Sequence, residues 1–374
     1  MHILLYSKPF FPSVGGIESV SLTLAEQIVA AGHVCTVITE TPAAGSSRRF
    51  PFSIERTPNK RRRLALARAA DVVHSNGASL ALFPYAKLAR RPFLWTHTAY
   101  QMVSVEGAGW LDGQPAPLTP LASLWLHARK RGLKTAAVAA VKLGLRRAVG
   151  RLVDKNVAIT NWVATRQPLP NQVVIYNPFP LGRFKRDDAP PPATRYDFLF
   201  LGRLVAEKGV TTLLSALALL NGQPRQRPAT VLIVGDGEQR PELEQMSANL
   251  GLTAHVHFAG QKSDQDLLDA IAQGAVAVVP SLLEEPMGGV GLELLAAGRP
   301  LIVSERGGLA ECVRGAAWTF PNGDHKALAD LMAALIDDEA LRNSRQAAAR
   351  EIVACFDERN LARAYLDLYA ELLL

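Results

Sequence analysis

Short apolar segments alternate with amphipathic segments along the first half of the chain. Residues 3–6 form a short apolar run, and a turn-rich loop with two adjacent glycines follows. Residues 18–31 then carry apolar side chains three or four positions apart, which predicts a helix ended by a glycine. Residues 34–39 are β-branched and predict a strand. Strand, loop, helix and strand form a βαβ unit, so we expect a parallel sheet. Further strands are predicted at residues 71–74, 93–96, 157–160 and 173–176.

The same alternation restarts after the proline-rich segment 188–194. Proline can neither donate to a sheet nor continue a helix, so this segment predicts a linker. A strand at residues 198–201 is followed by a loop and by a helix at 210–220. The chain is therefore predicted to form two doubly wound α/β domains. The remaining strands are expected at residues 230–234, 256–259, 275–279 and 301–303, with helices between them.

Composition narrows the class of protein. A chain of 374 residues fits two domains, and its 48% hydrophobic and 20% charged residues are ordinary for globular proteins. The net charge of +7 favours acidic partners such as nucleic acid, anionic lipid or phosphorylated small molecules. Three cysteines indicate neither a disulfide framework nor a metal site, and favour a cytoplasmic location. We expect no signal peptide and no membrane span.

The densest group of candidate functional residues lies at 281–298. A loop with Glu285 follows a predicted strand, and Gly288 and Gly289 lead into a helix. The unpaired N–H groups and the dipole of a helix start favour a bound anion. Glu293 lies inside this otherwise apolar helix, where a carboxylate is costly unless it is paired or faces a ligand. It either contacts a ligand or lies on a narrow polar edge of a buried helix.

Two further loops follow the first strand of each predicted domain. Arg203 and Lys208 lie at the carboxyl end of the strand at 198–201, where open α/β sheets bind ligands. Their side chains suit phosphate oxygens, although isolated loop cations are commonly solvated surface charges. Gly15 and Gly16 precede the first helix and suit close approach of a phosphate or hydroxyl. Their spacing is not that of a dinucleotide fingerprint.

Three weaker signals each also have a structural explanation. His97 directly follows a predicted strand and is either a catalytic group or a structural hydrogen-bonding residue. Glycine turns at 235–237 and 307–308 are, taken alone, plain turns. The Asp-x-Asp pattern at 264–266 follows Ser263, a predicted N-cap, so its acids complement a helix dipole rather than bind a metal. No cluster of residues predicts a metal site.

In this order, the segments resemble the retaining family 4 glycosyltransferases of GT-B fold, also called glycosyltransferase group 1. Glu285 and Glu293 are separated by seven residues, as in the paired glutamates of that family. The resemblance covers nearly the whole chain, is strongest over residues 197–322 and is looser over 110–156. The matching segments are GGIE at 15–18, GRLVAEKG at 202–209, GDG at 235–237, HFAG at 257–260, PSLLEEPMGGVGLE at 280–293 and GGLAE at 307–311.

The resemblance implies a role for each matching residue. Arg203 and Lys208, with the backbone at 288–290, hold the diphosphate of a nucleotide-sugar. Glu285 contacts the donor sugar and Glu293 the ribose. The implied catalytic set is His97, Arg203, Lys208 and Glu285. The implied donor-binding set is Gly15, Gly16, Gly202, Arg203, Lys208, Gly235, Gly260, Glu285, Met287, Gly288, Gly289, Val290 and Glu293. No metal and no cofactor are expected.

Three positions depart from the family pattern. Met287 stands where an aromatic residue is usual, and Gly289 stands where a branched apolar residue is common. Residues 177–180 read Asn-Pro-Phe-Pro instead of Asn-Gly-Val-Asp. The first two lie against the donor in the family, so they leave the identity of the donor open.

The resemblance also implies the organisation of the whole enzyme. Two Rossmann-like domains, residues 1–187 and 195–357, face each other across a cleft, and the helix at 358–374 crosses back to the first domain. The first domain binds the acceptor and the second the donor. We expect retaining transfer of a hexose-type sugar from a UDP- or GDP-sugar to a glycan or lipid-linked acceptor of a bacterial surface polysaccharide or lipopolysaccharide. The alternatives are a noncatalytic nucleotide-sugar-binding scaffold, a nucleotide-sugar epimerase or a phosphorylase of the same fold.

The segment 121–152 in the first domain is strongly basic. It contains eight lysines and arginines after residue 128 and no acid, and Val138, Val141, Leu145 and Val149 recur at helical spacing. This pattern predicts a basic amphipathic helix that binds the anionic surface at the inner face of the cytoplasmic membrane. The alternative is a solvated helix whose apolar stripe packs on the core. We expect no nucleic-acid partner, because no aromatic-interleaved basic patch is present.

Overall fold

The computed structural model describes residues 1–13, 15–43, 48–185 and 194–374. These residues divide into two compact units. The first unit comprises Met1–Gly109, Ala116–Pro180 and Phe356–Leu374, and the second comprises Trp110–Pro115 and Leu181–Cys355. The predicted linker at 188–194 lies outside the described residues except for its last residue.

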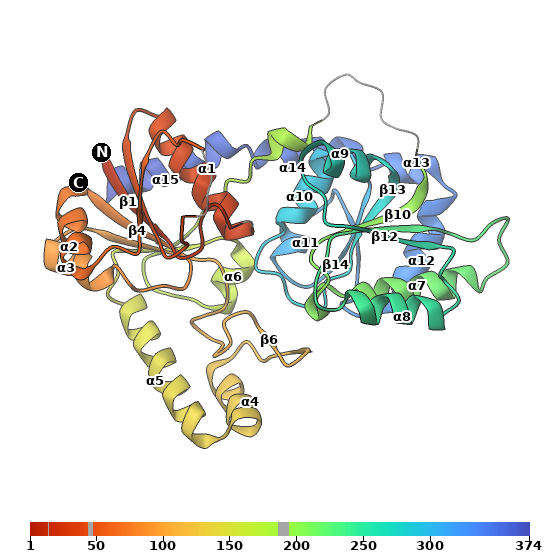
Figure 1. The fold of residues 1–374 in the computed structure, drawn as a ribbon, viewed down its shortest axis with the longest axis horizontal. Helices are drawn as coiled ribbons and strands as arrows, with labels where there is room; N and C mark the ends of the chain where they lie inside the picture. The colour runs from red at the N-terminus through yellow and green to blue at the C-terminus, as the bar shows by residue number, and fades with distance from the viewer. Residues whose placement is uncertain (14, 44–47, 186–193) are drawn as a thin grey trace. The chain divides into compact units, whose positions relative to one another are not determined.

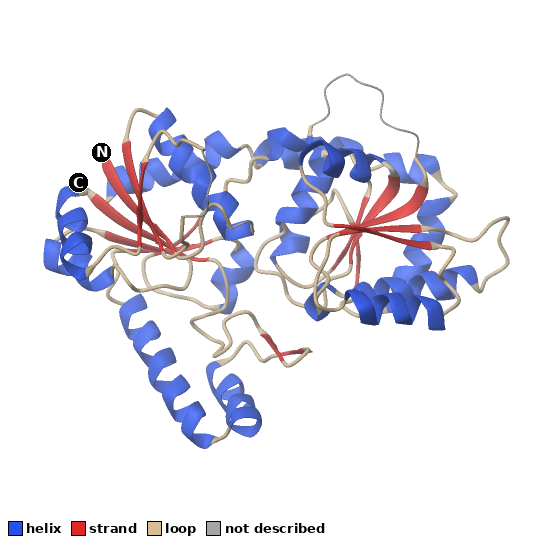
Figure 2. Cartoon of the chain, viewed as in Figure 1, coloured by secondary structure: helices blue, strands red, loops and turns tan. Residues whose placement is uncertain are grey.

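The first unit is built on one seven-stranded sheet in which every pairing is parallel (Figure 2). The strand order is β3-β2-β1-β4-β5-β8-β9. Six of these strands were predicted to within about two residues, whereas β3 was missed because it is a four-residue edge strand without a buried side chain. The strands are β1 (His2–Ser7), β2 (Val34–Thr39), β3 (Ser53–Arg56), β4 (Val72–Asn76), β5 (Phe93–His97), β8 (Lys155–Ala158) and β9 (Gln172–Val174).

Helices cover both faces of this sheet (Figure 1). Because side chains alternate along a strand, Ile3 and Leu5 of β1 pack in the core cluster that contains α1 and α15. Leu4 and Tyr6 point to the opposite face and pack with α2 and α3. The helices of this unit are α1 (Gly16–Ala30), α2 (Lys60–Ala69), α3 (Phe83–Ala89), α4 (Pro120–Arg131), α5 (Leu133–Gly150), α6 (Asn161–Arg166) and α15 (Glu358–Glu371).

The C-terminal helix α15 packs into the core of the first unit. The hydroxyl of Tyr369 lies 2.7 Å from Nδ1 of the buried His74, and the ring of Tyr365 stacks on that imidazole. Leu368 is buried on the same face, as the apolar spacing predicts. Leu373 lies beyond the helix end and is exposed.

The second unit is built on a six-stranded parallel sheet of order β12-β11-β10-β13-β14-β15. Its strands are β10 (Tyr196–Leu201), β11 (Val231–Val234), β12 (Val256–Gly260), β13 (Gly274–Val279), β14 (Leu301–Ser304) and β15 (Trp318–Phe320). The three-residue strand β15 and the short antiparallel hairpin of β6 (Trp110–Leu111) and β7 (Gln114–Pro115) were not predicted.

Helices connect the successive strands of this sheet, and others precede its first strand or follow its last one (Figure 1). They are the 3-10 turns η1 (Leu181–Phe184) and η2 (Ala206–Lys208) and the helices α7 (Val210–Asn221), α8 (Arg240–Asn249), α9 (Asp264–Ala272), α10 (Gly289–Ala296), α11 (Gly308–Cys312), α12 (His325–Ile336), α13 (Glu339–Asn343) and α14 (Gln346–Cys355). Helix α9 starts where predicted, but the side chain of Ser263 makes no capping hydrogen bond. The second unit begins at Leu181, before the predicted linker, because η1 packs against α10.

Both sheets reverse their strand order at one point. Counted within each unit, the order begins 3-2-1-4-5-6, so the reversal falls between β1 and β4 in one sheet and between β10 and β13 in the other. Parallel α/β sheets bind ligands beyond the carboxyl ends of the strands at such a point. The prediction of two doubly wound α/β domains is confirmed. Among the helices of the described residues, none combines the length and apolar character of a membrane span.

Candidate active site

Lys208 and Glu285 meet at the strand-order reversal of the second unit. Lys208 ends the loop after β10, and Glu285 lies in the loop after β13. The Lys208 Nζ atom lies 2.6 Å from Oε1 of Glu285, and both side chains are largely buried. Ser281 Oγ donates to the same carboxylate oxygen at 2.8 Å. The structure therefore brings two predicted site residues into one ion pair and adds a serine that sequence reasoning missed.

Glycine at position 209 lets these two loops pack against each other. Gly209 has a φ of +68°, and a Cβ atom there would lie 2.0 Å from the carbonyl oxygen of Pro280. Only a residue without a side chain accepts both the dihedral and the contact. The Leu282 amide also donates to the Glu207 carbonyl at 2.9 Å. The positions of Lys208 and Glu285 are thus set by backbone contacts between the loops that carry them.

Asn322 ties the Glu285 loop to the loop after β14. Its Nδ2 donates to the Ser281 carbonyl at 3.1 Å, and its Oδ1 accepts from the Arg306 amide at 3.0 Å. The Arg306 guanidinium in turn lies 2.6 Å from Glu284. Asn322 lies two residues after the short strand β15, and because that strand was not predicted, the sequence offered no signal for this residue.

The N-terminus of α10 adjoins the Glu285 loop. Gly288 is its N-cap and Gly289 its first residue. Met287 and Gly288 are buried, and Gly289 and Val290 are half-buried. The structure therefore places the glycine pair at a helix start, as predicted, whereas the Met287 side chain packs into the protein.

Glu293 lies on α10 and is held by a residue that the sequence did not point to. The Arg183 guanidinium, from η1, lies 3.4 Å from its Oε1. Burial raises the pKa of the Glu293 carboxyl, and the charge of Arg183 opposes that shift. Arg183 is mostly exposed. This buried carboxylate is therefore paired with a cation that has room to move away.

The other residues of the predicted donor set line the carboxyl ends of neighbouring strands. The Gly202 amide donates to the Val234 carbonyl at 3.1 Å, and the Gly235 amide donates to the Gly260 carbonyl at 2.9 Å. These bonds place the three glycines at adjacent strand ends. Arg203 is exposed and contacts Glu207 at 3.7 Å, so it does not join the ion pair of Lys208.

Gly15 and Gly16 lie at the N-terminus of α1 in the first unit, and Val14 beside them lies outside the described residues. A Cβ atom at Gly16 would meet nothing within 4 Å. A Cβ atom at Gly15 would lie 2.6 Å from Oε2 of Glu18, whose Oε1 accepts from Ser13 Oγ at 2.9 Å. The Cβ position of Gly16 is thus open, and this helix start also has a carboxylate of its own.

His97 is completely buried at the end of β5. The Asn156 amide nitrogen donates to the carbonyls of Gly150 and Pro170, so its oxygen faces His97 and accepts from Nε2 at 2.8 Å. Gln101 Nε2 donates to Nδ1 at 3.2 Å. Burial lowers the pKa of His97 to about 4. The ring is neutral with both nitrogens engaged, which is the geometry of a structural hydrogen-bonding residue.

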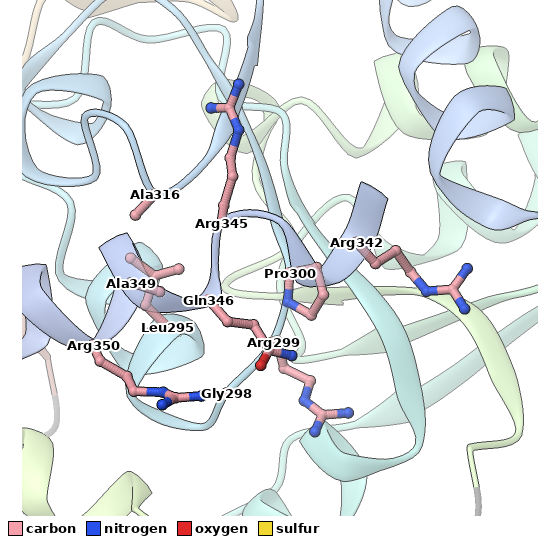
Figure 3. A pocket seen from close by; sticks show the side chains of 10 residues that line it. All are labelled: Leu295, Gly298, Arg299, Pro300, Ala316, Arg342, Arg345, Gln346, Ala349 and Arg350. Atoms are coloured by element: carbon pink, nitrogen blue, oxygen red, sulfur yellow. The ribbon is translucent and has the colours of Figure 1, made fainter. Parts of the chain in front are cut away.

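A cavity of about 190 Å³ lies elsewhere in the second unit, between the end of α10 and the helices α13 and α14 (Figure 3). Four arginines line it, but their guanidinium groups point in different directions (Figure 3). Arg342 donates to the Leu335 carbonyl at 2.8 Å, and the Arg345 guanidinium lies 4.7 Å from the centre of the Trp318 ring. None of the predicted site residues lines this cavity. Within the described ranges, no group of three or more His, Cys, Asp or Glu residues could hold a metal ion.

The sequence profile of the glycosyl transferases group 1 matches residues 183–352, the segment that contains the Lys208–Glu285 pair and α10. By this profile, the second unit is that of a group 1 glycosyltransferase. This glycosyltransferase is 28% identical to the glycogen synthase of Mycobacterium tuberculosis, over 99% of its own length and 94% of the relative. It is 30% identical to the lipopolysaccharide core biosynthesis glycosyltransferase LpsD of Rhizobium meliloti, over 49% of its length and 52% of the relative.

Solved structures show the same fold. HepE from Anabaena, in complex with UDP, superposes with a TM-score of 0.73 at 20% identity and covers 99% of this glycosyltransferase and 100% of HepE. WaaG, a glycosyltransferase involved in lipopolysaccharide biosynthesis, superposes with a TM-score of 0.69 at 18% identity and covers 98% and 99% of the two chains. The predicted GT-B fold is confirmed.

Proposed function

We propose that this glycosyltransferase moves a hexose from a UDP- or GDP-sugar to a glycan or lipid-linked acceptor, with retention of configuration and without a metal ion. One observation carries the proposal: a buried lysine and a glutamate meet at the strand-order reversal, beside a glycine-led helix start. HepE, which shares the fold, has been solved with UDP and with UDP-glucose, and this supports a uridine nucleotide donor.

In this proposal Lys208 stabilises the leaving group. Cleavage of the donor leaves negative charge on the diphosphate, and preorganised cations and N–H groups stabilise that charge. Lys208 and the first amides of α10 supply both, each charge-assisted hydrogen bond contributing about 1.5–3 kcal/mol. Arg203 turns from Glu207 toward the diphosphate and adds a planar pair of donors.

Glu285 then contacts the donor sugar. The diphosphate competes for Lys208, so the Glu285 carboxylate becomes available to hydroxyl groups of the transferred sugar. Ser281 and Asn322 hold the loop while this exchange takes place. Glu293 accepts a hydrogen bond from the ribose, and Arg183 moves away from it. The backbone of residues 288–290 lies along the diphosphate.

Retention follows in this scheme from a reaction on one face of the sugar. No side chain in the cluster is set up as a covalent nucleophile. The leaving phosphate therefore takes the proton of the attacking acceptor hydroxyl. His97 contributes by holding Gln101 and the loop after β5 in place rather than by proton transfer. Gly15 and Gly16 give the donor close access to the start of α1.

The acceptor and the cellular setting are proposed from the relatives. LpsD and LpsE of Rhizobium meliloti are named for lipopolysaccharide core biosynthesis, and a 32% identical relative from Mycobacterium leprae is named a phosphatidyl-myo-inositol mannosyltransferase. These names support a bacterial surface glycan or a lipid-linked acceptor. The enzyme would then work in the cytoplasm at the inner face of the cytoplasmic membrane.

A thermal-shift and calorimetric screen tests the donor site. UDP-, GDP- and ADP-sugars are added, with and without EDTA, to the wild type, to Lys208→Ala and to Lys262→Ala, which removes an exposed lysine of the same unit. We expect one nucleotide class to stabilise the wild type and Lys262→Ala, regardless of EDTA, and not Lys208→Ala. The absence of any shift, or an equal loss in both variants, would contradict the proposal. The anomeric coupling constant of the product, measured by NMR, tests retention.

A further inference from the structure

Helices α4 and α5 form a hairpin that extends away from the sheet of the first unit (Figure 1). They pack against each other and are joined at Gly132. Residues 121–152, which include nearly the whole hairpin, contain no acid. The basic residues of this segment are Arg129, Lys130, Arg131, Lys134, Lys142, Arg146, Arg147 and Arg151.

Three of the four residues in the apolar stripe of α5 do not pack on the core, whereas Val149 is half-buried against it. Val138, Val141 and Leu145 are spaced by three and four residues and are 56%, 63% and 60% exposed. The alternative in which this stripe packs on the core is therefore wrong for these three residues. On α4, Leu121 and Trp125 lie four residues apart and are 82% and 62% exposed.

These exposed apolar side chains stand among the basic ones. The Arg129 guanidinium lies 5.5 Å from the centre of the Trp125 ring, and Lys134 and Lys142 flank the apolar stripe. Exposed apolar side chains do not stabilise a surface that faces only water. A helix with apolar side chains beside cations is instead suited to the interface of an anionic bilayer. The charge pattern selects an anionic lipid surface over an uncharged protein partner.

A groove of about 500 Å³ beside α5 adds a second observation. Its floor includes Val138 and Leu143, and Lys142 and Arg146 contribute cations. Arg146 is half-buried, and within the described residues its guanidinium has no hydrogen-bond or ion-pair partner. The acid of the groove, Glu106, is paired with His127 at 2.7 Å. A partly desolvated, unpartnered cation above an apolar floor suits the phosphate of a lipid headgroup.

We propose that the α4–α5 hairpin docks this glycosyltransferase on an anionic lipid surface, with Val141, Leu145 and Trp125 entering the interface and Arg146 binding a headgroup phosphate. This inference rests on the proposed function to the extent that a lipid-linked acceptor lies at the membrane. It adds the element that makes the contact and the lipid chemistry that it recognises.

Vesicle sedimentation tests the apolar part of the contact. Full-length protein is mixed at moderate salt with phosphatidylcholine vesicles that either contain or lack phosphatidylglycerol. We expect binding only to the anionic vesicles, and at least a roughly tenfold weaker partition for the double variant Val141→Gln, Leu145→Gln. The control is Leu219→Gln, which removes an exposed leucine of α7 in the second unit.

Charge removal tests the headgroup contact. Because each cation near an anionic surface contributes about fivefold in partition, the double variant Lys142→Gln, Arg146→Gln should bind at least about 25-fold more weakly. The matched control Lys262→Gln, Lys326→Gln removes two exposed lysines of the second unit. A blue shift of Trp125 fluorescence should accompany binding and vanish in Trp125→Phe.

The outcomes separate this inference from the proposed function. Wild-type protein that ignores anionic vesicles, or hairpin variants that bind like their controls, overturn the docking inference while donor binding measured by calorimetry stays intact. Equal binding to uncharged vesicles overturns the charge argument. Loss of donor binding with vesicle binding retained would count against the proposed function and leave the hairpin in place.

Discussion

Replacing Gly209 by alanine should separate the two loops that hold Lys208 and Glu285. The residue combines a φ of +68° with a Cβ position 2.0 Å from the Pro280 carbonyl oxygen. Gly251 provides a matched control, because it has a φ of +72° but nothing within 4 Å of its Cβ position. Both substitutions cost the same backbone strain, and only the first creates a steric overlap.

The structure allows the size of the effect to be worked out. Positive φ costs an alanine about 1–2 kcal/mol at either position. At Gly209 the added methyl must move by more than about 1 Å to reach a normal contact, and such overpacking costs typically about 1–3 kcal/mol more. For a unit of this size, that difference lowers the unfolding midpoint of Gly209→Ala by roughly 2–12 °C relative to Gly251→Ala. Donor affinity should fall as well, since residue 208 adjoins the displaced backbone.

Differential scanning calorimetry of the two variants, followed by titration with the donor nucleotide, measures both effects. Gly251→Ala should keep wild-type donor affinity despite its modest loss of stability. Equal unfolding midpoints and equal donor affinities for the two variants would refute the reasoning, because the Pro280 contact would then not fix the relative position of the loops.

Three further predictions concern single side chains. Asn322→Ala should lower donor affinity about tenfold and the free energy of unfolding by about 1–3 kcal/mol, because buried carbonyl groups lose their hydrogen-bond donor. Calorimetric titration measures the donor affinity, and an unchanged affinity would show that Asn322 does not position the site. Glu293→Gln should be more stable than the wild type at pH 7, because burial raises the pKa of this carboxyl and the substitution removes the buried charge. The variant should nevertheless bind nucleotide more weakly. A lower stability than the wild type in urea unfolding would contradict this prediction. Burial lowers the pKa of His74 to about 3 and that of His97 to about 4, so both are neutral when folded, whereas the unfolded chain binds protons below pH 6.5. The contribution of these neutral histidines to the free energy of unfolding is therefore complete above pH 6.5. It declines as the pH falls toward 4, by about 1.4 kcal/mol per pH unit for each histidine. As the pH is lowered from 7 to 4.5, the urea midpoint should fall less steeply for His97→Gln than for the exposed control His325→Gln. Equal slopes for the two variants would argue against a lowered pKa of His97.

Most strands could be predicted because their residues are buried on both faces. Residues 275–279 stand out as a continuous apolar segment, and residues 34–39 stand out as a mainly β-branched one. The strands β3 and β15 were missed because three or four residues at a sheet edge form too short a pattern to be distinguished from a loop.

The pairing of Lys208 with Glu285 could be anticipated in part. Both follow apolar strands, and the carboxyl ends of parallel strands share one edge of a sheet. The ion pair of Glu293 with Arg183 could not be anticipated, because the two residues lie 110 positions apart in the sequence and no local pattern marks Arg183. The hydrogen bonds of His97 to Asn156 and Gln101 could likewise not be anticipated, because Asn156 comes from a distant part of the chain and Gln101 from the loop after β5.

The amino-acid sequence was enough to establish the repeated βαβ pattern, the two-unit organisation, the group 1 motif order and the strongly basic character of residues 121–152. These properties depend on local periodicity and on residue identity, and both can be recognised directly in an amino-acid sequence. Only the tertiary structure decided which charges meet, that His97 is fully buried, and that Val138, Val141 and Leu145 face solvent instead of the core. Periodicity places side chains on one face of a helix, but what that face meets depends on segments distant in the sequence, and therefore on the fold.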